Sequence, residues 1–320
     1  MPLNHEVIKK RNTLLKKFNL KLIKVFDTNE HEDYKDVVLV YDKKDKKKKV
    51  LRVGEHRAIN FFYQGYKGKN LIIPKIYRIN TKDNDKYEIE EFIGGKLLVD
   101  SLKKQTATYP LEDKYLELLI KTFWEFQTIA KRVKLSKPEV LNAKIKKHLE
   151  PAFKVMNLEL KSRVEKLFSN KMAVKFFTDL NYSRKWKFSV DNLILTPDNK
   201  IGFVDLARAG KSFWGYDLGW IFWPSWFHFP IQEYKKAKEH FIWLENLFHQ
   251  VEKHKPAKIK KINIQFSGYL LILERIIGAM FDFAANISHA RKITKSKQKT
   301  KAFVKFLNKL LELTLNKIEN

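Results

Sequence analysis

Two side chains with oxygen atoms, Asn192 and Asp205, stand on either side of a predicted β-hairpin. Residues 193–196 and 201–204 are mostly apolar and strand-like, and residues 197–200 (Pro-Asp-Asn-Lys) are typical of a turn. Such a hairpin can bring an Asn at its start beside an Asp at its end, and Mg²⁺ prefers oxygen ligands. The pair therefore predicts a metal site, although Asn and Asp are also ordinary residues of turns.

The segments that precede the hairpin predict a small lobe rich in β-structure. A helical pattern covers residues 3–18, and strand-like runs follow at 20–26, 37–41 and 50–53. A short helix at 55–64 and two further strands, at 72–77 and 86–92, lead to Gly94-Gly95. We therefore expect residues 1–94 to form an antiparallel sheet with a leading helix and one further helix.

The remaining residues, 95–320, predict a larger helical lobe that carries the hairpin. Apolar residues recur at helical spacing over 116–130, 143–168, 231–253, 258–286 and 301–318. Large aromatic residues crowd between positions 213 and 229, where we expect them to pack in the core rather than line a pocket. The whole pattern predicts a bilobal α+β fold.

The composition is that of a packed protein without thiol chemistry. Hydrophobic residues make up 44% of the chain, and no cysteine is present, which excludes disulfides and Cys-ligated metals. The first residues offer no signal peptide, because charges interrupt them. The best candidate for a membrane span, residues 268–285, contains Glu274, Arg275 and Asp282. We therefore expect a cytoplasmic protein with no transmembrane segment.

The formal net charge of +28 raises the question of a polyanionic partner. The basic residues are 54 Lys and only 10 Arg, and they are spread along the chain, with runs at 43–49 and 291–301. Dedicated nucleic-acid binders usually interleave arginine and aromatic residues on one face. We therefore attribute most of the charge to solvated surface and expect no specific nucleic acid, while binding of anionic lipid or RNA stays an alternative.

Further motifs follow in a fixed order along the chain: Val50-Leu51-Arg52-Val53, Glu91-Phe92-Ile93-Gly94-Gly95, Arg208-Ala209-Gly210 and Tyr216-Asp217-Leu218. Together with the spacing from Asn192 to Asp205, they resemble the motifs of the aminoglycoside phosphotransferase/choline kinase-like family. This family has a protein kinase-like fold. The resemblance extends over roughly residues 20–285 in the order of elements.

The resemblance implies ATP and Mg²⁺ as cofactors and a small-molecule acceptor as a further partner. It implies that Arg52 faces the phosphates and that Glu55 fixes it. The hinge residues Glu91, Phe92 and Ile93 would receive the adenine through their backbone. Asn192 and Asp205 would then hold the Mg²⁺ ions that bridge the phosphates of ATP.

Three departures from the family pattern surround this site. Lys187 occupies the position of the catalytic Asp, and Lys185 occupies that of the family His. A protonated lysine cannot accept the proton of an acceptor hydroxyl. The loop at 27–33, where the family covers the phosphates, contains four carboxylates and no glycine. We therefore predict a pseudokinase-like protein with impaired or lost phosphotransfer, and an active ATP-dependent kinase acting on a hydroxyl is the alternative.

Overall fold

The computed structural model describes residues 5–26, 36–54, 65–82, 85–101, 112–129, 141–169, 171–179, 182–185, 187–206, 209–257, 259, 262–287 and 290–320. The chain divides into two compact units. The first, the N-terminal unit, comprises Met1–Ser101, Ile129–Lys131 and Asp191–Gly210. The second, the helical unit, comprises Leu102–Thr128, Arg132–Val190 and Lys211–Asn320.

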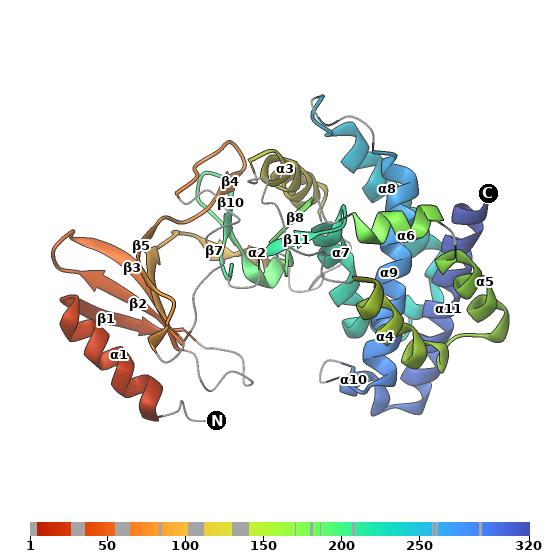
Figure 1. The fold of residues 1–320 in the computed structure, drawn as a ribbon, viewed down its shortest axis with the longest axis horizontal. Coiled ribbons are helices and arrows are strands. Elements are labelled where there is room, and N and C mark those ends of the chain that lie inside the picture. Colours follow the sequence, from red (N-terminus) through yellow and green to blue (C-terminus); the bar gives the residue numbers. More distant parts are fainter. Residues whose placement is uncertain are drawn as a thin grey trace. The chain divides into compact units, whose positions relative to one another are not determined.

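The N-terminal unit is built on a five-stranded antiparallel sheet in the order β1-β2-β3-β6-β5, drawn in red to orange in Figure 1. Its strands are β1 (Leu20–Val25), β2 (Asp36–Asp42), β3 (Lys47–Val53), β5 (Ile76–Asn80) and β6 (Tyr87–Glu91). Helix α1 (His5–Lys17) packs Leu14 and Leu15 against one face of this sheet. Apolar residues alternate along the strands, so that face buries Val38, Val40, Leu51, Val53 and Ile89.

A second sheet joins the predicted hairpin to strands of the N-terminal unit. Its order is β4-β10-β9-β7, with β4 (Leu71–Ile72), β7 (Lys96–Leu97), β9 (Leu193–Leu195) and β10 (Ile201–Phe203). Strand β10 runs parallel to β4 and antiparallel to β9, and α2 (Leu98–Ser101) follows β7. The predicted lobe limits, 1–94 and 95–320, stay a prediction, since the hairpin shares a sheet with strands from both sides of residue 94.

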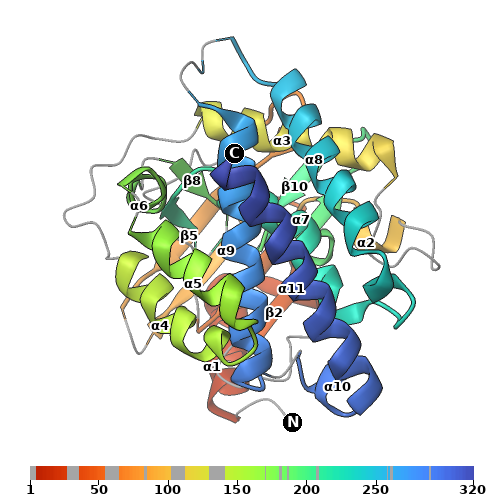
Figure 2. The same cartoon turned by 90° about the vertical axis from the view of Figure 1, so that its right-hand side faces the viewer.

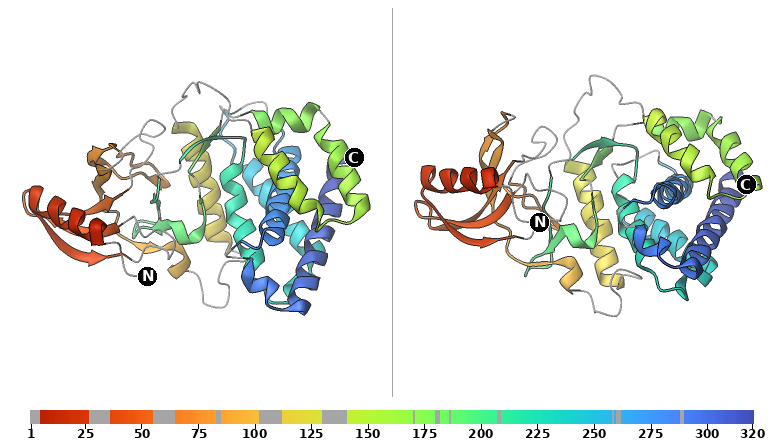
Figure 3. Two further views of the ribbon diagram at one scale, coloured as in Figure 1. Left: turned by 60° about the horizontal axis from the view of Figure 1, so that its bottom comes forward. Right: turned by 90° about the horizontal axis from the view of Figure 1, so that it is seen from below.

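The helical unit gathers around α9 (Ile264–Ala284), which packs against α4 (Leu141–Phe153), α8 (Ala237–Lys253) and α11 (Lys297–Glu319). Figure 2 shows α9 and α11 side by side, and Figure 3 gives two further views of these C-terminal helices in blue. The remaining elements of the described chain, some of which extend into the N-terminal unit, are α3 (Asp113–Ile129), α5 (Leu158–Phe168), α6 (Lys171–Thr178), α7 (Tyr216–Phe222), α10 (Arg291–Thr294), the strands β8 (Tyr182–Arg184) and β11 (Gly210–Ser212), and the 3₁₀ helices η4 (Val190–Asn192), η5 (Trp223–His228) and η6 (Glu233–Lys235).

Helix α9 is long and apolar enough to cross a membrane, but its contacts are those of a core helix. In its most apolar window, 67% of the residues are buried inside the protein. A Cβ atom at Gly268 would lie 2.6 Å from the ring of Phe248, so glycine permits the close approach of α8. Arg275 is buried in the middle of α9, where it forms an ion pair with Glu274 and lies 4.8 Å from the ring centre of Tyr216.

The aromatic residues between positions 213 and 229 are mostly buried, which confirms the prediction that they pack. Trp226 is completely buried, and its indole N–H donates a hydrogen bond of 2.8 Å to Nε2 of His240. The Tyr234 hydroxyl donates to the backbone carbonyl of Trp226 at 2.8 Å. Trp220 and Trp223 are half-buried and lie edge to face. This core is therefore held by ring contacts together with the hydrogen bonds of the Trp226 indole and carbonyl.

We expect the protein to lose stability as the pH is lowered, because His240 is buried in its neutral form. Burial lowers the pKa of this imidazole to about 3, from an ordinary value of 6.5. Below pH 6.5 the unfolded chain therefore binds a proton that the folded protein refuses, and stability is lost progressively down to about pH 3. The loss should approach about 1.4 kcal/mol for each pH unit in this window. Chemical denaturation at pH 7 and pH 5 measures it.

The matched variant is His240→Gln, because the amide oxygen of Gln can accept the Trp226 N–H without titrating. We expect the variant to lose less stability than the wild type between pH 7 and pH 5. Equal losses in the two proteins would contradict the assignment of this pH dependence to His240.

Candidate functional site

The hairpin places Asn192 and Asp205 at the same end. Leu193 pairs with Phe203 at the last rung of the β9–β10 ladder, and Asn192 and Asp205 lie one and two residues beyond it. Asn192 ends η4, and the backbone of Asp205 has a left-handed φ of 55°. At the opposite end, Thr196 closes the turn by bonding to Asp198 and Lys200. The hairpin therefore has the predicted geometry, and a metal ion at its open end stays a prediction.

The environment of Asp205 suits a ligand role. Its side chain is half-buried, and in the described part of the chain it forms neither a hydrogen bond nor an ion pair. No group of three or more His, Cys, Asp or Glu side chains gathers among the described residues. A two-residue site nevertheless fits Mg²⁺, which usually keeps waters and shares its coordination with phosphate oxygens.

The predicted hinge contacts this hairpin directly. Ile93 is buried, and a Cβ atom at Gly202 of β10 would lie 2.8 Å from its Cγ2 atom, so the Ile93 side chain lies on the backbone of β10. The backbone groups of Phe92 and Ile93 form no hydrogen bond with another backbone group in the described part. These groups therefore stay available to a ligand, as the backbone of an adenine-binding hinge must be.

Glu91 anchors the start of the hinge. Its N–H donates to the Lys75 carbonyl at 2.8 Å, and its carboxylate accepts bonds from the Lys75 N–H at 3.2 Å and the Lys67 ammonium at 2.7 Å. The hydrogen bond that Lys67 donates to Glu91 raises the pKa of Lys67. Glu91 therefore supports the hinge through its neighbours and does not itself offer a free N–H group.

Gly95 lets the chain pass from the hinge onto the hairpin. Its φ is 145°, and a Cβ atom there would lie 2.3 Å from the carbonyl oxygen of Leu195. The next residue, Lys96, pairs with Leu195 as β7 joins β9. The glycine is therefore required both by its backbone conformation and by the strand beside it.

Arg52 is held by a partner that the sequence analysis did not identify. Its Nε donates to Glu90 Oε1 at 2.9 Å, and only 13% of the Arg52 side chain and 5% of the Glu90 side chain are exposed. Glu88 lies opposite Arg52 in the β3–β6 ladder. Because Glu88 and Glu90 alternate with the buried residues Tyr87 and Ile89, both carboxylates share the face of Arg52. The alternation of Glu88 and Glu90 in the sequence could have indicated that these carboxylates lie beside Arg52. The expected partner, Glu55, lies outside the described residues.

The segment that begins at Lys185 and carries Lys187 is fixed within the helical unit. The backbone N–H of Lys185 donates to Oδ2 of Asp217 at 2.6 Å, and both residues are buried. Asp217 lies in the first turn of α7, behind the left-handed Gly215. Two residues after Lys185, Lys187 is half-buried with a left-handed φ of 49°. Asp217 thus holds this loop, a role that the Tyr-Asp-Leu motif could have indicated.

The structure brings most of the predicted site residues into one unit. Arg52, the hinge residues Glu91, Phe92 and Ile93, Asn192 and Asp205 all belong to the N-terminal unit, whereas Lys187 belongs to the helical unit. The acidic loop at 27–33 and Arg208 lie outside the described residues. The residues expected to bind nucleotide and metal therefore belong to a single compact unit.

Comparison with known proteins gives matches in structure alone. No family model and no curated protein sequence matches the chain. An aminoglycoside phosphotransferase from Alicyclobacillus acidocaldarius is similar over 100% of this chain and 97% of its own, with a TM-score of 0.60 and 11% identity. A thermostable mutant of aminoglycoside phosphotransferase APH(4)-Ia, in complex with ADP and hygromycin B, is similar over 92% and 97%, with a TM-score of 0.54 and 14% identity.

A third similar structure is that of amicoumacin kinase hAmiN with AMP-PNP and Ca²⁺. It covers 97% of this chain and 96% of its own, with a TM-score of 0.55 and 11% identity. These similarities confirm both the predicted resemblance and the predicted fold class. The chain therefore has the bilobal, kinase-like α+β fold of the aminoglycoside phosphotransferases, with a β-rich N-terminal part and a larger helical part.

Proposed function

We propose that this protein binds ATP with Mg²⁺ in its N-terminal unit and that its phosphotransfer is impaired or lost. The observation that carries the proposal is the contact of Ile93 with Gly202, which joins the hinge to the hairpin that bears Asn192 and Asp205. We also propose a cytoplasmic location, where nucleotide is abundant and a chain without cysteine needs no oxidising compartment.

The site residues of the N-terminal unit have separate roles in this proposal. The backbone groups of Phe92 and Ile93 bind the adenine, and Arg52 faces the phosphates with its positive charge. Asn192 and Asp205 hold the metal. When bound, Mg²⁺ would neutralise the charge on the phosphate oxygens.

Two features support the loss of phosphotransfer. The loop position that carries the family's catalytic carboxylate is Lys187, and the nearest carboxylate in the loop, Asp191, is exposed in η4. A lysine ammonium can contact phosphate as a point charge but offers no base for an acceptor hydroxyl. In addition, Arg52 is already engaged by Glu90, so part of its charge is neutralised before any phosphate arrives.

A thermal-shift titration tests nucleotide and metal binding. Ligand that binds the folded protein stabilises it by RT ln(1 + [L]/Kd), so ATP with Mg²⁺ should raise the melting temperature. We expect Asp205→Ala to remove the Mg²⁺-dependent part of the rise and to keep the part due to nucleotide alone. Asp198→Ala is the matched control, because Asp198 lies at the opposite end of the same hairpin. No rise at millimolar ATP would end the proposal.

The second candidate function, an active kinase for a small molecule with a hydroxyl group, is favoured by the structural neighbours. Two of them were solved in complex with a nucleotide, and one of these complexes also holds hygromycin B. ATP turnover in the wild type decides between the two functions. Metal-dependent turnover that Asp205→Ala abolishes would show an active enzyme and contradict lost phosphotransfer.

We expect Glu90→Gln to raise the affinity for ATP several-fold. The substitution removes the charge that neutralises Arg52 while keeping an oxygen that accepts its Nε–H, so the guanidinium attracts phosphate more strongly. Affinity for adenosine, which has no phosphate, should stay unchanged. Isothermal titration calorimetry with both ligands measures the difference.

Asp85→Asn is the control for Glu90→Gln, since it removes one negative charge from an exposed side chain of the same unit. It should leave ATP affinity within about twofold, because exposed charges are well screened. If Glu90→Gln weakened ATP binding, Glu90 would be a support for Arg52 and not a competitor of phosphate.

A further inference from the structure

Lysines from three segments meet at one end of the five-stranded sheet. Leu20, at the start of β1, pairs with Asp42 at the end of β2, and the Lys43 N–H donates to the Asn19 carbonyl at 3.5 Å. The last turn of α1, the start of β1 and the β2–β3 turn therefore lie together, as Figure 1 shows. This lysine end comprises Lys16, Lys17, Lys21 and the lysines at 43, 44, 46, 47 and 48, all exposed.

The carboxylates of the lysine end are already engaged. Asp42 and Asp45 both form ion pairs with the buried ammonium group of Lys49. The distance from Lys49 Nζ to Asp42 Oδ2 is 2.7 Å. None of the exposed lysines of this end forms an ion pair with any of the residues that the structure describes. Their positive charge is therefore uncompensated and directed to solvent.

Exposed aliphatic side chains border the lysine end. β1 is the edge strand of the sheet, and Leu22, Ile23 and Val25 are 36%, 46% and 39% exposed. Lysines 21 and 24 alternate with them, and the register shifts between Leu22 and Lys24. Lysines on an edge strand also discourage pairing with other strands. That role does not explain the lysines of the turn or the exposed aliphatic residues.

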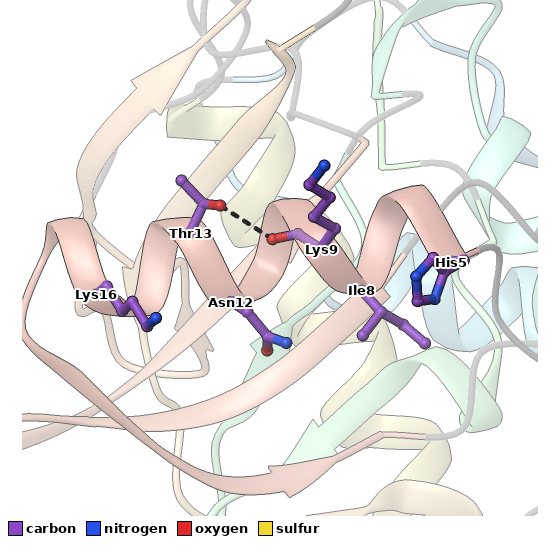
Figure 4. Close-up of a pocket in the computed structure, with 6 residues that line it drawn as sticks. All are labelled: His5, Ile8, Lys9, Asn12, Thr13 and Lys16. Atoms are coloured by element: carbon purple, nitrogen blue, oxygen red, sulfur yellow. Dashed lines mark hydrogen bonds between the residues drawn. The ribbon is translucent and has the colours of Figure 1, made fainter.

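The outer face of α1 continues this surface. A hollow of about 300 Å³ is lined by side chains of α1, including His5, Lys9, Asn12 and Lys16, as Figure 4 shows. The Thr13 hydroxyl, which also lines it, donates to the Lys9 carbonyl at 3.1 Å. The hollow adds ammonium and amide donors that suit the phosphate and carboxylate groups of lipid heads.

We propose that the lysine end and the neighbouring edge of β1 dock on an anionic lipid surface. Clustered lysines attract acidic headgroups, and aliphatic side chains at the border can enter the interface. RNA fits less well, because the exposed side chains that border the lysines on β1 are aliphatic. The exposed ring of Tyr77 and the exposed guanidinium of Arg78, which lie near this end, are already engaged by Lys49 at 4.1 Å and by the Phe18 ring at 4.6 Å. The cytoplasmic leaflet, which is rich in anionic lipid, is the surface that this chemistry suits.

Vesicle co-sedimentation tests the proposal on the full chain. Vesicles of phosphatidylcholine alone are compared with vesicles that also contain about one third phosphatidylserine. We expect the protein to bind only to the vesicles that contain phosphatidylserine. Replacement of the lysines at 43, 44, 46, 47 and 48 by glutamine should weaken it by at least about tenfold. These side chains are exposed, so the variant should keep the fold.

The matched control replaces five exposed lysines of the helical unit by glutamine, at positions 292, 295, 297, 301 and 305. It removes the same charge, so an equal loss of binding would show diffuse attraction and overturn the proposal. Binding to a short single-stranded RNA, without binding to the anionic vesicles, would also overturn it. Ile23→Ser should weaken vesicle binding at high salt, where screening leaves the aliphatic contribution; no effect there would remove β1 from the proposed surface.

Discussion

Gly95→Ala is expected to lower the free energy of unfolding by about 2–5 kcal/mol, because the new methyl group meets a strand backbone and the residue keeps a glycine conformation. At φ 145° a residue with a side chain is strained whatever the space around it. The Cβ would lie 2.3 Å from the Leu195 carbonyl oxygen, and a strand backbone cannot move away as a flexible side chain can. Urea denaturation followed by circular dichroism measures the change.

The neighbouring glycine supplies the control. A Cβ atom at Gly94 would meet nothing within 4 Å, and Gly94 has no positive φ. Gly94→Ala should therefore change stability by less than about 1 kcal/mol. Similar losses of stability in the two variants would mean that a side chain is tolerated at Gly95 as well as at Gly94.

Because Gly95 connects the hinge to β7, the same variant has a functional consequence. Displacement of β7 from β9 would shift the hairpin relative to Ile93, which rests on Gly202. We therefore expect any folded fraction of Gly95→Ala to bind ATP more weakly than Gly94→Ala does.

Local patterns were sufficient to predict the elements that carry the site. The hairpin around Pro197 and the strand that presents Arg52 each follow from a few neighbouring residues, through alternation and turn chemistry. The hinge at 91–93 was placed by the motif resemblance. The fold class followed from the order of strands and helices, together with that resemblance.

Long-range pairing could not be predicted in the same way. One partner of Arg52 is Glu90, from a strand 38 residues away, which the motif pattern did not indicate. The partner that the pattern did indicate, Glu55, lies outside the described residues. Likewise, β10 pairs with β4, a contact between residues 201 and 71 that no local pattern encodes. Composition and the spacing of lysines along the chain likewise do not reveal that the β2–β3 turn meets the end of α1 in space.

The backbone conformation at Lys187, where the family has its catalytic Asp, is unusual for a lysine. A left-handed φ is unfavourable for lysine but well tolerated by aspartate and asparagine, whose short side chains can bond to nearby backbone. The position thus has a backbone conformation that suits aspartate, while its side chain carries an ammonium group. The loop around it is held by the bond from Lys185 to Asp217.

Lys187→Asp is therefore expected to raise metal-dependent ATP turnover by at least about 100-fold, since a positioned base contributes about 10²–10⁴ to such reactions. The substitution restores a carboxylate without straining the backbone, so the fold should be kept or slightly stabilised. Lys187→Asn is the matched control, because asparagine accepts the same conformation and removes the same ammonium but cannot act as a base. Turnover, measured as ADP release, should rise in the Asp variant alone and fall again when Asp205→Ala is added. If the two variants bind ATP equally well and neither turns it over, the missing carboxylate is not what limits phosphotransfer in this protein.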